Sequence, residues 1–144
     1  MPLYECFYYA NIPEDKSYGI VMPPSDPANP NRGDYFIDTF PLYDVYSNKI
    51  GYLKIEGTEV SSDCKIYTNE TLTFFLYENN NYMSAQILYV APENSDGYFQ
   101  EGSPVVGTIT YCSGPNINKI GQMTIYPLND AKRTRYVKLQ INIV

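Results

Sequence analysis

The chain has 144 residues, the usual size of a single domain, and its 10 Lys and Arg stand against 16 Asp and Glu for a net charge of −6. An acidic surface of this kind repels a phosphate backbone, which argues against nucleic-acid binding. The chain contains no histidine, which excludes Ser-His-Asp and Cys-His nucleophilic systems and nearly all catalytic zinc sites.

The first residues, Met1 to Cys6, lack the basic start and the apolar core of a secretory signal. No stretch approaches the roughly 18 apolar residues that a membrane helix needs. An outer-membrane barrel is also disfavoured, because one face of the later strands is polar: Lys54, Glu56, Lys138, Gln140 and Asn142. We therefore expect a protein that is not exported by a signal peptide, located in the cytoplasm or in a virion, with no membrane partner.

Three cysteines, Cys6, Cys64 and Cys112, lie far apart and form no C-x-x-C pair, so neither a zinc site nor a redox pair is indicated. Reduced thiols are the first interpretation. A single disulfide with one free thiol, or a reactive cysteine, remain as alternatives. Glycine-rich phosphate loops are absent as well, and no cofactor or metal is predicted.

In chain order, residues 3–10 are predicted as a strand rich in Tyr and Phe, followed by a polar loop over residues 11–16. Residues 22–33 then hold Pro23, Pro24, Pro27 and Pro30, which cannot serve in a strand ladder and favour an extended path. We predict a proline-rich loop or arm here and no domain boundary, because too little chain precedes it to fold alone. Residues 1–144 are thus expected to form one domain.

Seven further strands are predicted from residue 34 onward, at Tyr35–Val45, Lys49–Ser61, Glu70–Glu78, Tyr82–Ala91, Ser103–Cys112, Ile117–Tyr126 and Thr134–Ile143. Alternation of apolar and polar residues supports them and is clearest in the last strand, where Val137, Leu139, Ile141 and Ile143 share one face. Turn sequences rich in Asn, Ser, Gly and Pro separate the strands. No window carries a sustained helical period.

Short connections between consecutive strands predict antiparallel neighbours, and eight such strands can close and remove their exposed edges. The predicted fold is therefore an all-β, eight-stranded, antiparallel up-and-down β-barrel. A sandwich is the alternative, because the sequence does not show closure. Gly107 and Gly121 fall among the inward positions, where a small barrel needs tight curvature or close packing.

Several short strings of the chain are shared with a known barrel family. They are Phe40-Pro41-Leu42-Tyr43-Asp44 with Asn48-Lys49-Ile50-Gly51-Tyr52-Leu53, then Glu70-Thr71-Leu72-Thr73-Phe74-Phe75, then Ser103-Pro104-Val105-Val106-Gly107 with Lys119-Ile120-Gly121. In this order they resemble the successive strands of the allene oxide cyclase and dirigent-protein barrels, over roughly residues 35–143. The resemblance implies an eight-stranded antiparallel barrel, commonly a homotrimer, in a family of fatty-acid epoxide cyclases and proteins that steer phenol radical coupling.

The resemblance also extends to residues 9–16, which are similar to the first strand and loop of the plant cyclases. In those cyclases an Asn helps to hold a water at the barrel mouth, and Asn11 matches that position. Tyr9 stands where the family has a glutamate, and Glu59 or Val60 stands where it has a cysteine. The resemblance thus implies ligand contacts at Asn11 and Tyr9 without the family's catalytic residues.

Two pairs of acids fall on predicted strands. Asp34 and Asp38 share a face, whereas Glu56 and Glu59 do not. Solvated surface acids are the first interpretation, because a carboxylate acting as acid or base would need burial that raises its pKa. The local basic cluster is interpreted as a solvated turn, with contact to an acidic partner as the alternative: Lys132, Arg133 and Arg135.

The chain has 16 tyrosines, whose apolar faces and polar tips suit a core, a protein contact surface or a ligand pocket. The residues expected at a partner contact are Tyr4, Tyr8, Pro23, Pro24, Pro27 and Pro30. The first functional hypothesis is a non-catalytic structural or assembly protein, for example a minor capsid protein of a virus particle, with protein partners that include further copies of itself. The alternative is a barrel that binds a small apolar ligand, or an isomerase or cyclase acting at the barrel mouth. A packed interior would favour the first.

Overall fold

The computed structural model describes residues 3–10, 20–21, 34–62, 65–92, 103–128, 130–131 and 133–142, and nearly all of them lie in strands. The strands are β1 (Leu3–Tyr9), β2 (Ile20–Val21), β3 (Asp34–Tyr43), β4 (Lys49–Ser62), β5 (Lys65–Leu76), β6 (Asn81–Pro92), β7 (Val105–Cys112), β8 (Ile120–Pro127) and β9 (Thr134–Asn142). Two single 3₁₀ turns, η2 (Glu78–Asn80) and η3 (Gly114–Asn116), complete the elements. None of the helical segments in these ranges is long enough to cross a membrane.

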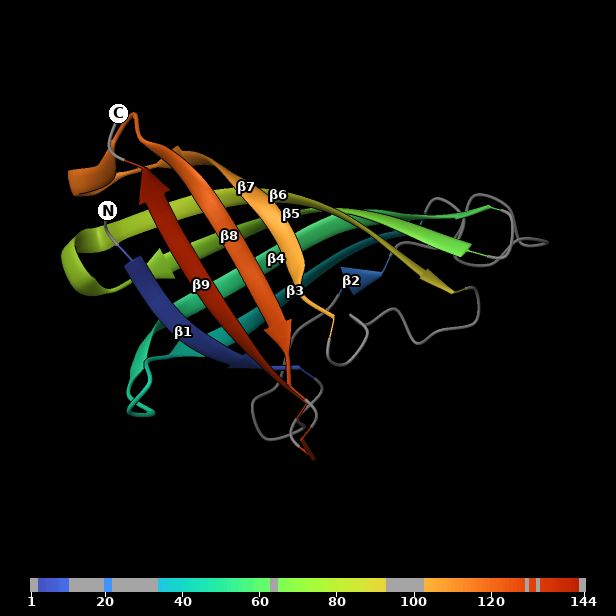
Figure 1. The fold of residues 1–144 in the computed structure, drawn as a ribbon, viewed down its shortest axis with the longest axis horizontal. Coiled ribbons are helices and arrows are strands. Elements are labelled where there is room, and N and C mark those ends of the chain that lie inside the picture. The colour runs from blue at the N-terminus through green and yellow to red at the C-terminus, as the bar shows by residue number, and fades with distance from the viewer. Residues whose placement is uncertain are drawn as a thin grey trace.

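The strands form one antiparallel sheet in the order β1-β9-β8-β7-β6-β5-β4-β3-β2, and a further pairing of β1 with β3 closes it (Figure 1). The two-residue strand β2 pairs only with Phe36 and Ile37 of β3, so the closed wall consists of the other eight strands. The predicted eight-stranded antiparallel barrel is confirmed, and the sandwich alternative is wrong.

The barrel closes because alternate residues of every strand carry apolar side chains to one face. The fully buried core residues include Leu42, Leu53, Leu72, Phe74, Met83, Ile109, Met123, Ile125, Leu139 and Ile141. Removing this much apolar surface from water is the main force that stabilises such a fold. Gly107 lies inside as predicted, and a Cβ there would lie only 2.7 Å from the Met123 methyl carbon.

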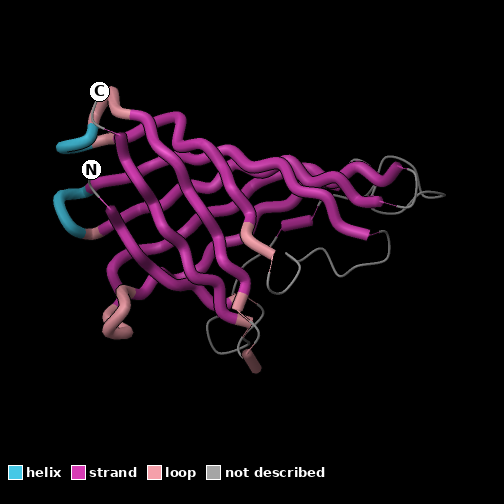
Figure 2. The backbone as a smooth tube through the Cα atoms, viewed as in Figure 1, coloured by secondary structure: helices cyan, strands magenta, loops and turns pink. Residues whose placement is uncertain are grey.

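The two ends of the barrel differ. We call the end that carries both chain termini and the turns β3–β4, β5–β6 and β7–β8 the terminal end, and the opposite end the distal end (Figures 1 and 2). At the terminal end the β3–β4 turn is held by Asp44, whose carboxylate accepts the backbone N–H groups of Tyr46 and Asn48, each at 2.9 Å. Segments 11–19, 22–33, 63–64 and 93–102 lie outside the described residues. The proline-rich prediction for 22–33 falls among them.

The two largest differences from the predicted strand boundaries are at the starts of β5 and β8. β5 begins at Lys65, five residues before the predicted start, because polar residues there continue the ladder from Ser62↔Lys65 on β4 and Lys65↔Pro92 on β6. β8 begins at Ile120, because the residues before it form η3. Both differences arise where polar or turn residues interrupt the apolar alternation.

Several of the described tyrosines and phenylalanines form rows on the outer face. Tyr52, Phe75, Tyr82 and Tyr111 come from four successive strands, and their neighbouring ring centroids lie 5.0, 6.4 and 5.6 Å apart. Offset aromatic pairs at these separations stabilise cross-strand contacts. We call this set the outer aromatic row.

Candidate functional site

A group of polar side chains lies inside the distal half of the barrel, next to a mainly apolar core. Tyr8 on β1 and Arg135 on β9 are direct cross-strand partners and are 2% and 3% exposed. Glu70 and Thr68 on β5 are buried as well, at 4% and 0% exposure. We call Tyr8, Thr68, Glu70 and Arg135 the interior polar cluster.

Tyr8 interacts electrostatically with both charged side chains of the cluster. Burial is the largest cause that raises the pKa of Tyr8, the charge of Glu70 raises it further, and the charge of Arg135 lowers it. A phenol that responds to both charges lies close to both. Strands that are far apart in the chain thus bring a carboxylate, a guanidinium and a phenol to one place.

The position of Glu70 depends on a glycine. Gly57 on β4 is the cross-strand partner of Glu70, and a Cβ at Gly57 would lie 2.9 Å from the Glu70 Cγ. Any other residue there would collide with the Glu70 side chain. The missing side chain leaves the space in which the Glu70 carboxylate lies.

Arg135 is anchored by its own strand. Its Nη1 donates to the carbonyl oxygens of Arg133, at 3.1 Å, and Thr134, at 3.4 Å. Arg133 itself has a φ of 50°, so the backbone turns sharply just before Arg135 enters the barrel. A guanidinium held in this way presents a fixed positive charge to the interior.

Thr68 of the cluster and Asp38 of β3 add to the polar character of this interior. The Thr68 hydroxyl is fully buried and has no hydrogen-bond partner among the described residues. Asp38 of β3 lies on the same strand face as the buried Phe40, and burial raises the pKa of its carboxyl. A buried polar atom without a partner is costly and is found most often at functional sites.

The chemistry available here is proton transfer and charge stabilisation. A buried carboxylate can accept a proton from a bound molecule, and a phenol and a guanidinium can donate hydrogen bonds to an oxygen that gains negative charge. Within the described ranges no three His, Cys, Asp or Glu side chains come together as a metal site would require. Cys6 and Cys112 are both buried free thiols, and Cys64 lies outside the described residues.

The sequence-predicted site residues lie elsewhere or outside the described part of the chain. Asn11, Pro23, Pro24, Pro27 and Pro30 all belong to ranges that the structure does not describe. Tyr9 is on the outer face, with its ring 5.4 Å from that of Tyr43. Tyr4 is half-buried, and its hydroxyl accepts a hydrogen bond from Asn116 at 3.2 Å. Tyr8, expected at a partner surface, lies instead in the interior polar cluster.

Sequence reasoning missed Glu70 and Arg135, although the signal was present. Val137, Leu139 and Ile141 all face inward, and stepping back by two residues places Arg135 on the same face. Stepping back from Leu72 does the same for Glu70. The interpretation of Arg135 as part of a solvated turn is therefore wrong, because this residue lies within β9 and is buried.

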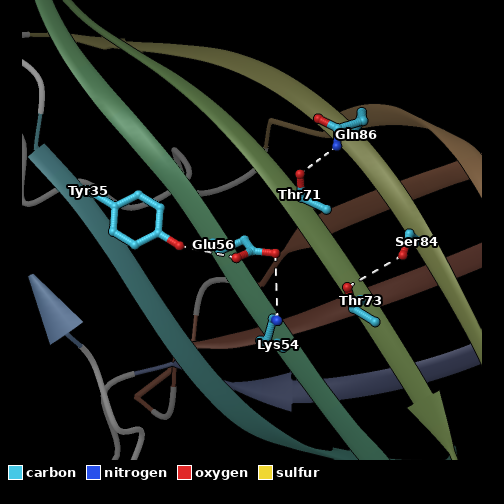
Figure 3. A network of polar contacts seen from close by, with 7 residues as sticks. All are labelled: Tyr35, Lys54, Glu56, Thr71, Thr73, Ser84 and Gln86. Carbon is cyan, nitrogen blue, oxygen red and sulfur yellow. Dashed lines mark hydrogen bonds and ion pairs between the residues drawn. The ribbon is translucent and has the colours of Figure 1, made fainter.

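The outer face of β3–β6 carries a second polar group (Figure 3). The Tyr35 hydroxyl donates to Glu56 at 3.2 Å, the Lys54 ammonium lies 3.7 Å from the same carboxylate, and the Gln86 amide donates to the Thr71 hydroxyl. Glu56 is half-exposed, as predicted for a surface acid.

Comparison with known proteins finds the same barrel in enzymes. No protein-family model and no curated protein sequence matches the chain. A solved structure described as a pyocyanin demethylase matches with a TM-score of 0.68 and 16% identity, over 98% of this chain and 100% of that chain. A nonspecific heme-binding cyclase of neoabyssomicin biosynthesis matches with a TM-score of 0.60 and 18% identity, over 99% of this chain and 65% of its own. The Diels–Alderase AbmU from Streptomyces koyangensis matches with a TM-score of 0.57 and 19% identity, over 99% of this chain and 68% of its own.

At these identities the likeness establishes the fold, which is the barrel class that these cyclases share. The expectation of a non-catalytic assembly protein is wrong, because the similar barrels are enzymes. The virion and minor capsid hypotheses are overturned with it. Titratable side chains also lie in the interior, at Glu70, Tyr8 and Arg135, where that hypothesis placed none.

Proposed function

We propose that the protein is a ligand-binding barrel enzyme of the isomerase or cyclase kind, acting on a small, mostly apolar molecule at the distal end of the interior. The observation that carries this proposal is the burial of Tyr8, Glu70 and Arg135, from three different strands, within electrostatic range of Tyr8 and inside a barrel whose core is mainly apolar. Convergent polar groups in an apolar enclosure are the usual composition of a small-molecule site.

The distal location follows from the packing. Leu72, Phe74, Met83, Leu139 and Ile141 are fully buried and fill the interior nearer the terminal end. A ligand in that half would have to displace close-packed side chains, which costs more than binding returns. The unpartnered Thr68 hydroxyl instead offers a hydrogen bond in the distal half.

Glu70 is the proposed acid–base group, and Tyr8 and Arg135 are the proposed donors to a developing negative charge. In an enolisation, Glu70 takes the proton from the carbon next to a carbonyl. The electron pair of the broken C–H bond forms a C=C bond, the π pair of the C=O bond moves to the oxygen, and that oxygen is stabilised by the two donors. Return of the proton to a second carbon completes an isomerisation. The resemblance to the allene oxide cyclase and dirigent barrels supports a site for a small ligand in the barrel, with Asn11, one residue after the buried Ala10, as a further proposed ligand contact.

The experiment separates binding from chemistry. With 2-acetonaphthone as probe, a flat apolar ketone, the full chain is expected to show saturable binding and to speed exchange of the methyl protons with D₂O, followed by NMR. Glu70→Gln keeps the shape of the side chain and should lose about 10²–10⁴-fold in exchange rate while retaining binding. Glu56→Gln, on the outer face, is the matched control and should exchange normally. Exchange that is equally fast in both variants would reject Glu70 as the base.

A further inference from the structure

A shallow depression on the outer face of β3–β6 carries a second, independent candidate site. It is lined by Tyr35, Glu56, Gly57, Thr58, Asn69, Thr71 and Gln86 and has a volume of about 260 Å³. Sites for drug-sized ligands range over roughly 300–1,000 Å³, so this depression suits a single small ring.

The lining is an ordered array on the sheet. Tyr35, Thr58 and Asn69 form one cross-strand row on β3, β4 and β5, and Glu56, Thr71 and Gln86 form the next row on β4, β5 and β6 (Figure 3). Given the spacing of strands and of residues along them, the array covers roughly 7 Å by 10–15 Å. That area matches one or two six-membered rings.

The polar groups of the array are held in place, and some of them remain available. Hydrogen bonds from Tyr35 to Glu56 and from Gln86 to Thr71 fix four of the side chains. The Asn69 amide and the Thr58 hydroxyl, both exposed, make no side-chain hydrogen bond within the described residues. The depression therefore offers donors and acceptors side by side next to one aromatic ring.

The charge of the lining narrows the class of ligand. Glu56 is its one ionised side chain, and the Lys54 ammonium lies 3.7 Å away. A phosphate would meet no unpaired cation here, and a metal ion would meet one carboxylate that is already engaged. An apolar molecule would find only the Tyr35 ring.

A second protein strand is also disfavoured as the occupant. At the depression, β3, β4, β5 and β6 are paired with one another residue by residue, so no backbone edge is open for strand addition. Only side chains face outward at this place.

We propose that this depression binds a neutral, polyhydroxylated ring, that is, a sugar residue. The Tyr35 ring would stack on the C–H face of the sugar, while Asn69, Gln86 and Glu56 would exchange hydrogen bonds with its hydroxyl groups. This site lies on the outer face and does not depend on the interior chemistry proposed above.

The test is titration of the ¹⁵N-labelled full chain with methyl β-D-glucopyranoside, methyl β-D-galactopyranoside and methyl α-D-mannopyranoside, followed by amide shifts. A single-ring ligand on a shallow site is expected to bind with a dissociation constant on the order of 1–10 mM, with shifts confined to the array. Tyr35→Ala and Asn69→Ala should each weaken binding about tenfold or more. Tyr77→Ala, an exposed tyrosine in the turn after β5, is the matched control and should bind normally.

Four outcomes would overturn the proposal. They are no shifts at the array with any of the three glycosides, binding that Tyr35→Ala and Asn69→Ala leave unchanged, stronger shifts of the same amides with inorganic phosphate, or a dimer in sedimentation that Tyr35→Ala dissociates. The last would assign the surface to a second copy of the chain. None of these results bears on proton exchange by Glu70, so the two proposals stand or fall separately.

Discussion

At the scale of single residues, the interior polar cluster depends on the contrast between Gly57 and Glu70. The backbone of Gly57 has a conformation that residues with a side chain also adopt. A Cβ at this position would nevertheless lie 2.5 Å from the Asn69 carbonyl oxygen and 2.9 Å from the Glu70 Cγ. The glycine is needed for space and not for a special φ. Its neighbour Thr58 points outward and has no such constraint.

Gly57→Ala is therefore expected to push Glu70 out of place and to lower the free energy of unfolding by about 1–3 kcal/mol, as overpacked cores do. Thr58→Ala, one residue away and exposed, should change it by less than about 0.5 kcal/mol. Urea unfolding followed by circular dichroism measures the free energy of unfolding of both variants. Equal midpoints for the two variants would show that the space beside Gly57 is not limiting.

The carboxyl of Asp38 gives a prediction with a definite sign in pH. Burial raises its pKa in the folded chain. A carboxyl with a raised pKa favours folding while it is protonated, so this contribution is complete below the unfolded value of about 3.9 and is lost as the pH rises through the folded pKa. At neutral pH the ionised form costs stability. Asp38→Asn should thus stabilise the protein at neutral pH, and the gain in the urea midpoint should disappear in acid.

At the scale of elements, the β3–β4 hairpin contains a carboxyl, Asp44, whose effect on stability changes with pH in the opposite direction to that of Asp38. Hydrogen bonds from the Asn48 backbone, the Asn48 side chain and the Tyr46 backbone lower the pKa of Asp44. This stabilisation is present above the unfolded pKa and is lost as the pH falls through the folded pKa. Because Ser47 adopts a φ of 67°, the turn also depends on these bonds to hold an unfavourable backbone.

Asp44→Ala should accordingly lower the thermal midpoint at neutral pH and leave it nearly unchanged in acid, where the wild-type carboxyl is protonated. Scanning calorimetry across this pH range measures the difference. If the thermal midpoint of Asp44→Ala stays below that of the wild type by the same amount down to acid pH, the turn is held by something other than the Asp44 carboxylate.

The elements also show which parts of the fold could be predicted from the sequence. The barrel strands were predictable where apolar and polar residues alternate, as in Val137–Ile141. The start of β5 was not, because Thr68 and Glu70 are polar residues that face inward, and alternation by residue type loses its meaning there. The site was missed for the same reason: a charge inside a barrel breaks the pattern by which an interior is recognised. Only the strand parity, continued through Glu70 and Arg135, could have revealed it.

At the scale of the whole molecule, closure depends on the seam between β1 and β3. Their backbone pairing is limited to Phe7↔Tyr43, whereas β1 pairs with β9 over seven residues. Ring contacts support the seam from both sides, with Tyr8 and Phe40 centroids 5.2 Å apart inside and those of Tyr9 and Tyr43 5.4 Å apart outside. We expect this seam to open first.

Cys6, inside β1, reports on that opening. Burial raises its pKa to about 12, so its thiolate fraction near pH 8 should be roughly a thousandfold below that of an unfolded cysteine. Alkylation mapped by mass spectrometry should be correspondingly slow in the native protein and faster in Phe40→Ala. Ile109→Ala, a core truncation on the opposite wall, should raise the rate less. If the two truncations accelerate Cys6 labelling equally, the barrel opens only as a whole.

The outer aromatic row gives the molecule an optical signature of its own. The chain has 16 tyrosines and no tryptophan, and three of the four rings in the row are tyrosines whose neighbours lie within about one ring diameter. Excitation can migrate between chromophores held this closely and in fixed relative orientation. The native protein should therefore show near-ultraviolet ellipticity from these fixed rings, and this signal should be lost when the strands separate, which makes unfolding measurable without any label.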